Sequence, residues 1–366
     1  MNLNPRSERS WGLLDMKSNW IKKPLSKVVM FKNGKKRPKD FGNIPVYGGN
    51  GILGYADNSN YENCIIIGRV GAYCGSVCYE NNKCWVSDNA IAAQPIGENN
   101  IIFIYYLLKN LQLNNRHIGT SQPLLTQEIL NRIECAIPPV EEQNRIASII
   151  NLIDEKIQNN IQINDNLLQQ ASTIYKAWFE DFSPFDGICP AGWKQGTLSD
   201  IADITSGRRP PMKSAEKTDI AIIPLVGAAS VMGFTSESNH TDKILVTGRV
   251  GTHGVVQRFN TPCWTSDNTL VITSDFYEYT YQILQQIDYH ALNRGSTQPL
   301  ITQGDMNKVA IIIPDRQTLD NFETLVGQLM LQYEANLLEN TKLADLRDAL
   351  LPRLMSGELD VSDIAL

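Results

Sequence analysis

Two short basic clusters have the residue types and spacing to bind nucleic acid. Lys35, Lys36 and Arg37 form the first cluster, Arg208 and Arg209 form the second, and each directly follows a glycine in a turn-rich stretch. Loop lysines and arginines suit phosphate contact, and arginine can also donate two hydrogen bonds to guanine. The alternative is an ordinary solvated loop. We favour DNA contact because the clusters match in position between two halves of the chain.

The two halves are copies of one module. Three further motifs recur in the same order: Gly-Arg-Val-Gly at 68–71 and 248–251, Cys-Trp-x-Ser-Asp-Asn at 84–89 and 263–268, and Gly-x-x-Gln-Pro-Leu-x-Thr-Gln at 119–127 and 295–303. The offset between the copies stays between 173 and 180 residues. Ordered matches at a near-constant offset indicate an internal duplication.

The duplicated arginines, Arg69 and Arg249, lie between glycines that would let the backbone approach DNA closely. The alternative is a structural arginine that pairs with Asp88 or Asp267 in the neighbouring motif. The sequence does not separate these two interpretations.

The duplicated amides are Asn89, Gln122, Asn268 and Gln298, and amides suit hydrogen bonding to adenine. If the two modules read different DNA sequences, identical residues in both copies cannot distinguish them, so a scaffold or phosphate role is favoured. We expect base readers where the copies differ, such as 72–83 against 252–262.

The stretch Tyr47–Tyr55 contains Gly-x-Gly-x-x-Gly, the spacing of a dinucleotide-binding loop. Only Gly54 of its three motif glycines keeps a partner, Gly233, in the second copy, and turn-forming residues follow instead of a helix start. A dinucleotide loop needs a strand before it and a helix after it. We therefore interpret the glycines as permitting a tight strand turn.

A zinc site is also disfavoured. Of Cys74, Cys78 and Cys84, only Cys84 has a counterpart, Cys263, whereas structural zinc needs four well-placed ligands. The sequence predicts no bound cofactor or metal.

Two long amphipathic segments follow the modules. Apolar residues at spacings of three and four run from Val140 to about Phe182 and again beyond residue 315, which is a heptad pattern over five repeats. Helices of about 40 residues would be about 60 Å long.

Both heptad seams carry asparagine in two central positions. If the helices pair antiparallel about their midpoints, Asn160 faces Asn340 and Asn164 faces Asn336. A seam asparagine disfavours other registers because a slip would place its amide against Ile or Leu. The alternative is that the helices diverge there and the amides are hydrated.

Composition limits the class of protein. The 366 residues carry a net charge of −6 and seven cysteines, without a secretory signal or an apolar stretch long enough to span a membrane. These features predict a cytoplasmic protein. Residues 1–138 carry 16 Lys and Arg against 10 Asp and Glu, whereas residues 315–366 carry 4 against 10. The basic module fits nucleic acid, and the acidic helix fits protein docking.

The sequence thus predicts an α+β fold: two mixed, mostly-β modules joined by two long helices that form an antiparallel coiled coil, with internal pseudo-two-fold symmetry. The predicted ranges are 1–20 (lead), 21–138 (module 1), 139–182 (helix), 183–314 (module 2) and 315–366 (helix and tail). Two-fold-related modules match the symmetry of B-DNA, on which readers one helical turn apart face the same side.

The duplicated motifs resemble those of the specificity (S) subunits of type I restriction-modification systems. The similarity runs from about residue 20 to 360 and includes Pro-Pro-x-x-Glu-Gln at 138–143, Trp-Phe-Glu-Asp-Phe at 178–182 and Leu-Leu-Pro-Arg-Leu-Met-Ser-Gly-Glu at 350–358. The polar lead of some 20 residues departs from this pattern.

The resemblance implies two target-recognition domains, each of which reads half of a bipartite, asymmetric site in double-stranded DNA. It implies that the helices dock two modification subunits, which use S-adenosylmethionine to methylate adenine, and that restriction subunits join them to cleave DNA. S-adenosylmethionine, ATP and Mg²⁺ are expected on those partners only.

Two other classes of protein were weighed. An adenine methyltransferase would need an Asn/Asp-Pro-Pro-Tyr/Phe loop, which the sequence lacks, and Pro314-Asp315 lacks the acidic-x-Lys spacing of a nuclease, so we predict no catalytic activity. A coiled-coil adaptor that does not bind DNA is the remaining alternative.

Overall fold

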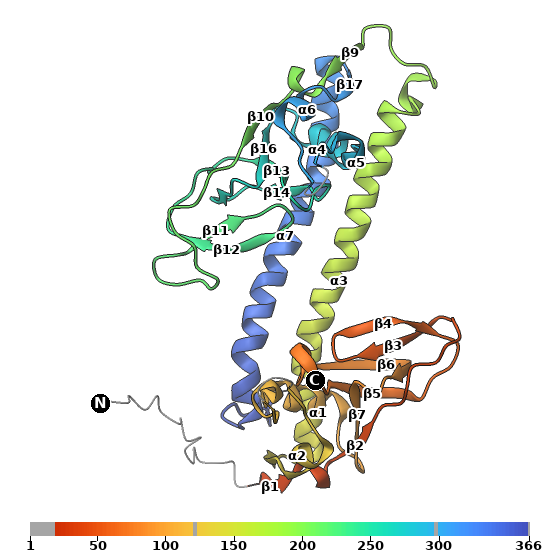
Figure 1. Cartoon of the computed structure of the whole chain (residues 1–366), viewed down its shortest axis with the longest axis vertical. Coiled ribbons are helices and arrows are strands. Elements are labelled where there is room, and N and C mark those ends of the chain that lie inside the picture. Colours follow the sequence, from red (N-terminus) through yellow and green to blue (C-terminus); the bar gives the residue numbers. More distant parts are fainter. Residues whose placement is uncertain (1–18, 120–122, 296–298, 365–366) are drawn as a thin grey trace. The chain divides into compact units, whose positions relative to one another are not determined.

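The computed structural model describes residues 19–119, 123–295 and 299–364 (Figure 1). The chain divides into two compact units, unit 1 (Met1–Asn159 with Leu338–Leu366) and unit 2 (Asn160–Leu337). The two long helices, α3 (Val140–Phe179) and α7 (Arg316–Met355), each contribute residues to both units.

Unit 1 contains a six-stranded sheet in the order β2-β7-β5-β6-β3-β4. The strands are β2 (Val29–Asn33), β3 (Ile44–Gly48), β4 (Gly51–Ala56), β5 (Tyr61–Gly68), β6 (Val77–Val86) and β7 (Ala90–Pro95). Only the β3–β6 pair is parallel. The central strand β5 is apolar at consecutive positions because both of its faces are buried.

The rest of unit 1 joins this sheet to the long helices. Strand β1 (Ile21–Pro24) pairs with β8 (Glu134–Ile137), and two shorter helices are α1 (Ile101–Asn110) and α2 (Gln127–Arg132). One core cluster holds Ile65 of β5, Phe103 of α1, Ile150 of α3 and Leu354 of α7. The sheet region is therefore packed onto both long helices by shared apolar contacts.

Unit 2 repeats this plan with shorter strands. Its sheets are β10 (Asp203–Ser206), β16 (Thr269–Thr273), β13 (Ile244–Gly248) and β14 (Gln257–Phe259); β12 (Val231–Thr235), β11 (Ile223–Val226) and β15 (Trp264–Thr265); and β9 (Lys194–Thr197) with β17 (Ala310–Ile313). Its helices are α4 (Tyr277–Gln286), α5 (Tyr289–Leu292) and α6 (Gln303–Asn307).

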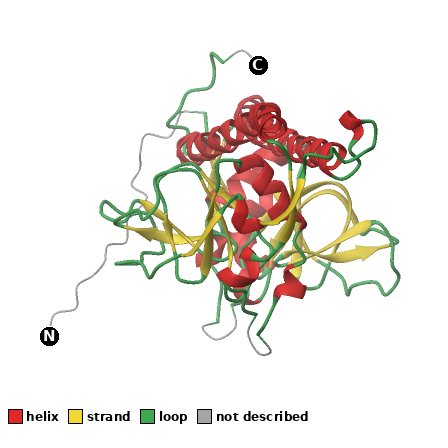
Figure 2. Cartoon of the chain, turned by 90° about the horizontal axis from the view of Figure 1, so that it is seen from above, coloured by secondary structure: helices red, strands yellow, loops and turns green. Residues whose placement is uncertain are grey.

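Short 3-10 turns complete the described fold: η1 (Leu25–Lys27), η2 (Gly71–Tyr73), η3 (Leu113–Asn115), η4 (Ser183–Phe185) and η5 (Leu198–Asp200). Figure 2 shows loops at the outer ends of the strands. Within the described residues, no helix is long and apolar enough to cross a membrane.

The long helices run antiparallel within each unit. In unit 1, Arg347 pairs with Asp154 at 2.7 Å and Glu339 pairs with Lys156 at 3.3 Å. A higher residue number on α3 therefore corresponds to a lower residue number on α7, as antiparallel helices require. The four predicted seam asparagines, Asn160, Asn164, Asn336 and Asn340, are at least partly buried. The predicted α+β fold, the repeated module and the two long helices packed together are confirmed. The boundary between the two compact units falls inside both long helices, whereas the domain ranges predicted from the sequence keep each helix whole. Those predicted ranges stay a prediction.

Candidate nucleic-acid interface

The Gly-x-Gly-x-x-Gly stretch forms a hairpin. β3 and β4 pair antiparallel with Gly48 opposite Gly51, and a strand follows the glycines where a dinucleotide loop would need a helix. Gly54 and its partner Gly233 have φ angles of +146° and +144°, a conformation that L side chains rarely adopt. The interpretation as a tight strand turn is confirmed, and the shared backbone angle explains why, of the three motif glycines, Gly54 persists in both copies.

The backbone holds both basic clusters in the same way. In unit 1 the indole Nε1 of Trp85 donates to the carbonyl of Lys35 at 3.2 Å, and in unit 2 Trp264 donates to Arg208 at 2.8 Å. The main-chain N–H of Lys35 and of Arg208 also bonds to the residue after that tryptophan. Lys35 and Arg208 are therefore structurally equivalent.

The glycine before each cluster is required by close backbone packing. A Cβ on Gly34 would lie 2.0 Å from the carbonyl oxygen of Ser87, and a Cβ on Gly207 would lie 2.1 Å from that of Ser266. Each cluster thus passes directly over the Ser-Asp-Asn loop of its own unit, which fixes where its side chains start.

The remaining duplicated motifs are joined by main-chain hydrogen bonds. The Arg69 N–H donates to the Asn89 carbonyl at 3.0 Å, and the Arg69 carbonyl accepts from Leu125 at 2.9 Å. In unit 2, Arg249 repeats both bonds, with Asn268 at 2.8 Å and Ile301 at 2.9 Å. The motifs recur because they form one backbone frame, which supports the scaffold interpretation of the duplicated amides.

Most predicted contact residues project into solvent from this frame. Lys35, Lys36, Arg37, Asn89, Arg208, Arg209 and Asn268 are exposed, and Arg69 and Arg249 are partly buried. Gln122 and Gln298 lie outside the described residues.

The alternative role for the duplicated arginines is wrong for the second copy. Asp267 pairs with Arg209, a member of the basic cluster, at 3.0 Å. In the described parts of the chain, no ion pair joins Arg249 to Asp267 or Arg69 to Asp88. The pairing partner is set by proximity across the frame, where Arg209 passes the Ser-Asp-Asn loop.

One histidine, His240, lies near the second basic cluster. Burial, and then the positive charge of Arg208, lower the pKa of His240 from its usual value. Both effects favour the neutral imidazole of His240.

The cysteines are distributed between different environments. The Cys74 thiol donates to the carbonyl of Arg69, whereas Cys64 and Cys84 have sulfur atoms 3.6 Å apart in a separate core cluster. Among the described residues, no three potential ligands lie close enough to hold a metal ion.

The seam asparagines form specific contacts. In unit 2, Asn336 Nδ2 donates to Asn164 Oδ1 at 2.8 Å, and Asn164 Nδ2 donates to the Tyr333 carbonyl at 3.2 Å. Both residues are 4% exposed, so hydrated, diverging helices do not describe this pair. In unit 1, Asn340 Nδ2 donates to the Ile157 carbonyl at 3.5 Å. Asn160 is buried.

Sequence reasoning missed two charged clusters that tie the sheet regions to the long helices. In unit 1, Asp154 of α3 bonds to Tyr106 of α1 and to Arg347 of α7. In unit 2, Arg258 of β14 bonds to Glu278 of α4 and to Glu334 of α7. Arg347 follows Asn336 and Asn340 at the heptad spacing of α7, so a charge at an apolar position was the available signal, whereas Arg258 lies in a divergent stretch where the sequence gave none.

These features define a class of protein: a duplicated, mostly-β module that presents an equivalent basic loop surface in each copy and packs on long antiparallel helices. Comparison with known families matches the domain described as "Type I restriction modification DNA specificity domain" at residues 17–169 and 190–344. The chain belongs to this family. It is a DNA specificity subunit of a type I restriction-modification system, a non-catalytic subunit with two target-recognition domains.

Individual relatives agree. The type I restriction enzyme MjaIX specificity subunit of Methanocaldococcus jannaschii is 29% identical over 75% of this chain and 76% of that protein. The HindI specificity subunit of Haemophilus influenzae is 24% identical over 65% and 71%. The crystal structure of a type I S subunit from M. genitalium shares the fold, with a TM-score of 0.64 at 19% identity over 97% of this chain and 98% of that one.

Proposed function

We propose that each unit binds one half of a bipartite, asymmetric site in double-stranded DNA. Lys35, Lys36 and Arg37 would hold phosphates or guanine in one half, and Arg208 and Arg209 in the other. The observation that carries this proposal is the equivalent backbone frame, which presents exposed cations at matching positions of both units. Base-independent cation contacts supply a large share of the affinity in protein–DNA interfaces.

The segments that differ between the copies support different half-sites. In unit 1, residues 77–86 form the single ten-residue strand β6, whereas the corresponding stretch of unit 2 is split into β14 and β15. The same frame therefore carries two different reading surfaces. Asn89, Gln122, Asn268 and Gln298 remain candidates for phosphate contact, and Arg69 and Arg249 for close backbone approach.

We further propose that α3 and α7 dock two modification subunits, which recruit restriction subunits. Exposed leucines on α7, such as Leu331 (54% exposed) and Leu338 (58%), and the acidic charge of 315–366 support protein docking there. S-adenosylmethionine, ATP and Mg²⁺ would be held by those partners. All seven cysteines are free, which supports a reducing, cytoplasmic location.

The seam asparagines fit a register function in this assembly. A slip of one helix along the other would separate Asn164 from Asn336 and place each amide against apolar seam residues. Fixed register would fix the spacing of the two half-sites. We extend the same function to Asn160 and Asn340.

Salt-dependent binding tests the phosphate contacts. The full chain with its modification subunit is titrated with a selected duplex at several salt concentrations, and log K is plotted against log salt. Replacing Lys35 and Lys36 by Gln should reduce the slope by about 2, since each phosphate contact contributes about 0.9. Lys109→Gln, an exposed lysine of α1 outside both proposed interfaces, is the control and should keep the slope.

Methylation sequencing tests the division of the site. The chain is expressed with its modification subunit in a methylation-deficient host, and methyladenine motifs are read from the genome. We expect one motif of two unlike halves and a fixed gap. Absence of both a motif and salt-dependent DNA binding would favour the adaptor alternative.

A further inference from the structure

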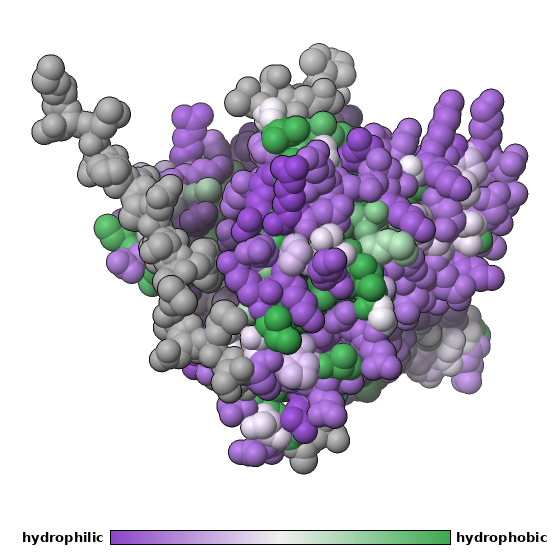
Figure 3. Space-filling view, turned by 90° about the horizontal axis from the view of Figure 1, so that it is seen from below, coloured by the Kyte–Doolittle hydropathy of each residue, from purple (hydrophilic) through white to green (hydrophobic). Residues whose placement is uncertain are grey.

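Each unit exposes a pair of large apolar residues at the same place on a hairpin strand. Ile52 and Leu53 of β4 are 49% and 45% exposed, and Val231 and Met232 of β12 are 45% and 39% exposed. Each pair directly precedes the positive-φ glycine that both hairpins share. Hydrophilic residues cover most of the face shown in Figure 3, where hydrophobic residues form small separate patches. Two matched apolar pairs therefore need an explanation.

The second residue of each pair is seated on a glycine. A Cβ on Gly48 would lie 2.6 Å from Cδ1 of Leu53, and a Cβ on Gly227 would lie 2.8 Å from Sδ of Met232. The glycine provides the space in which the apolar side chain lies across the hairpin. Side chains ordered before binding lose less conformational entropy when they meet a partner.

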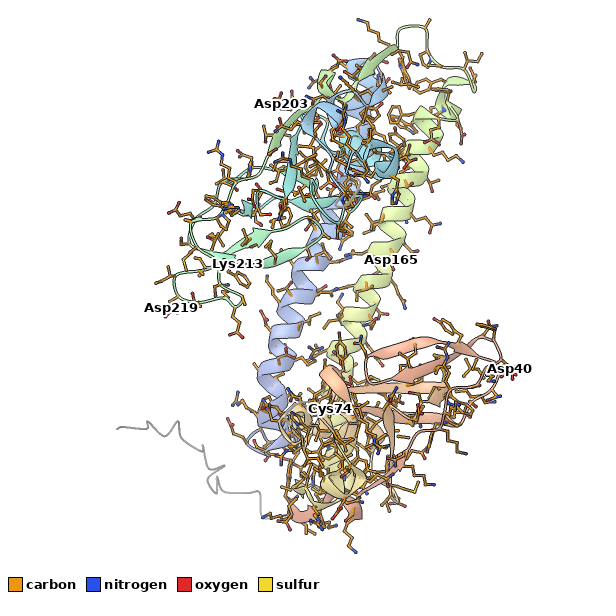
Figure 4. All side chains as sticks on the ribbon, in the orientation of Figure 1. Asp40, Cys74, Asp165, Asp203, Lys213 and Asp219 are labelled. Carbon is orange, nitrogen blue, oxygen red and sulfur yellow. The ribbon has the colours of Figure 1, made fainter. Side chains whose placement is uncertain are left out.

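Basic loops run along the outer side of both hairpins. β4 and β12 are each the last strand of their sheet. In unit 1, Arg37 Nη1 donates to the Leu53 carbonyl at 3.2 Å, and in unit 2 Ser214 forms a bridge with Phe234 of β12. Figure 4 shows Lys213 on the loop beside the β11–β12 hairpin.

The charge of these loops identifies the occupant as a polyanion. Residues 32–40 contain five Lys and Arg against one acidic residue, and residues 206–219 contain four against two. An apolar pair bordered by cations matches the major groove of DNA, where thymine presents a 5-methyl group between rows of phosphates. A two-stranded hairpin fits this groove.

We propose that Ile52 and Leu53 in unit 1, and Val231 and Met232 in unit 2, contact thymine methyl groups in the major groove and contribute to half-site specificity. This inference rests on the proposed DNA-reading function. The pairs differ in shape, Ile-Leu against Val-Met, as two different half-sites require.

The test removes the methyl group from either partner. Wild-type complex is titrated with the duplex found by methylation sequencing and with duplexes in which one thymine is replaced by deoxyuridine. At the contacted positions we expect affinity to fall about fourfold, the equivalent of ~0.8 kcal/mol per buried methyl group. In the Ile52→Ala/Leu53→Ala variant, the same substitutions should have no further effect in the half-site of unit 1, with the salt slope unchanged because no phosphate contact is lost.

The matched control is Ile21→Ala, which removes an equally exposed apolar side chain (56% exposed) from β1. It should keep both affinity and uracil sensitivity. Thermal unfolding of the hairpin variant should show a cooperative transition well above the assay temperature, because each deleted side chain is only about half covered.

Three results would overturn the inference. The hairpin variant could keep the full sensitivity to uracil, or no thymine of either half-site could prove sensitive to replacement by deoxyuridine. The hairpin variant could also lose binding to the modification subunit while its DNA affinity stays intact. The last would identify the hairpins as protein-docking surfaces. If the wild-type complex binds DNA with a steep salt slope, but neither deoxyuridine in the duplex nor the Ile52→Ala/Leu53→Ala variant alters the affinity, only this inference fails. If the wild type does not bind DNA, the proposed function fails with it.

Discussion

The buried ion cluster of unit 2 gives the sharpest stability prediction. Arg258 of β14 is 6% exposed and donates to both oxygens of Glu278, at 2.6 and 2.8 Å, and to Glu334 at 3.1 Å. Its guanidinium also stacks on Tyr277 and Tyr281, with ring centroids 4.8 and 4.7 Å away. One side chain thus links β14 to α4 and to α7.

Replacing Arg258 by Met keeps most of the side-chain volume but leaves the Glu278 carboxylate, 5% exposed, without a cation. Breaking a buried pair by removing one partner costs about 3–5 kcal/mol. For a unit of this size, that corresponds to a fall in Tm of roughly 6–20 °C. The double variant Arg258→Met/Glu278→Met should recover most of the loss because no fully buried charge remains; Glu334 is 18% exposed and also bonds to Asn260.

The assay is urea unfolding of the four members of this mutant cycle, with amide hydrogen exchange to locate the change. Exchange should accelerate in β13 and β14 of unit 2, while β5 of unit 1 serves as the internal control. A loss below about 1 kcal/mol for Arg258→Met, or a double variant less stable than the single one, would show that the cluster contributes no net pairing energy.

Three further predictions address the seam, the hairpin and pH. Asn336→Leu alone should cost about 1–3 kcal/mol in urea unfolding because it leaves the buried Asn164 Oδ1 without its donor, whereas Asn164→Leu/Asn336→Leu should be more stable than the single variant and show faster exchange in α7 as register loosens. Gly233→Ala should lower the free energy of unfolding by about 1–3 kcal/mol, since φ is +144° and the new Cβ would lie 2.4 Å from a backbone carbonyl oxygen; Gly192→Ala, with open space around it, should not. Burial raises the pKa of Glu323 to about 7, so the folded state binds this proton more tightly than the unfolded state, and stability should fall as pH rises from about 4.5 to 7. Glu323→Gln should remove that slope, and an unchanged slope would assign it to other groups.

Two kinds of signal in the sequence predicted the arrangement of modules and helices: the apolar spacing within each long segment and the repetition of motifs. Apolar spacing in the long segments predicted helices that the structure places at Val140–Phe179 and Arg316–Met355. Repeated motifs predicted two modules, and the loss of two glycines from the second copy correctly argued against a dinucleotide loop. Heptad periodicity can be read from the sequence because it depends on spacing along one helix, and the duplication can be read because matching motifs recur in the same order.

The partners of individual polar groups were decided by the tertiary structure. Asp267 pairs with Arg209, not with Arg249, because the basic loop crosses the Ser-Asp-Asn turn at close range. Nothing in the sequence marked Arg258 as buried, since its burial depends on α4 and α7 converging on a short strand. The sequence by itself determined that the chain holds two equivalent modules and two long helices that were predicted to pair antiparallel. The tertiary structure decided which side chains of those modules lie in solvent. Exposure depends on packing between segments that are distant in the sequence, and not on a residue's neighbours in the chain.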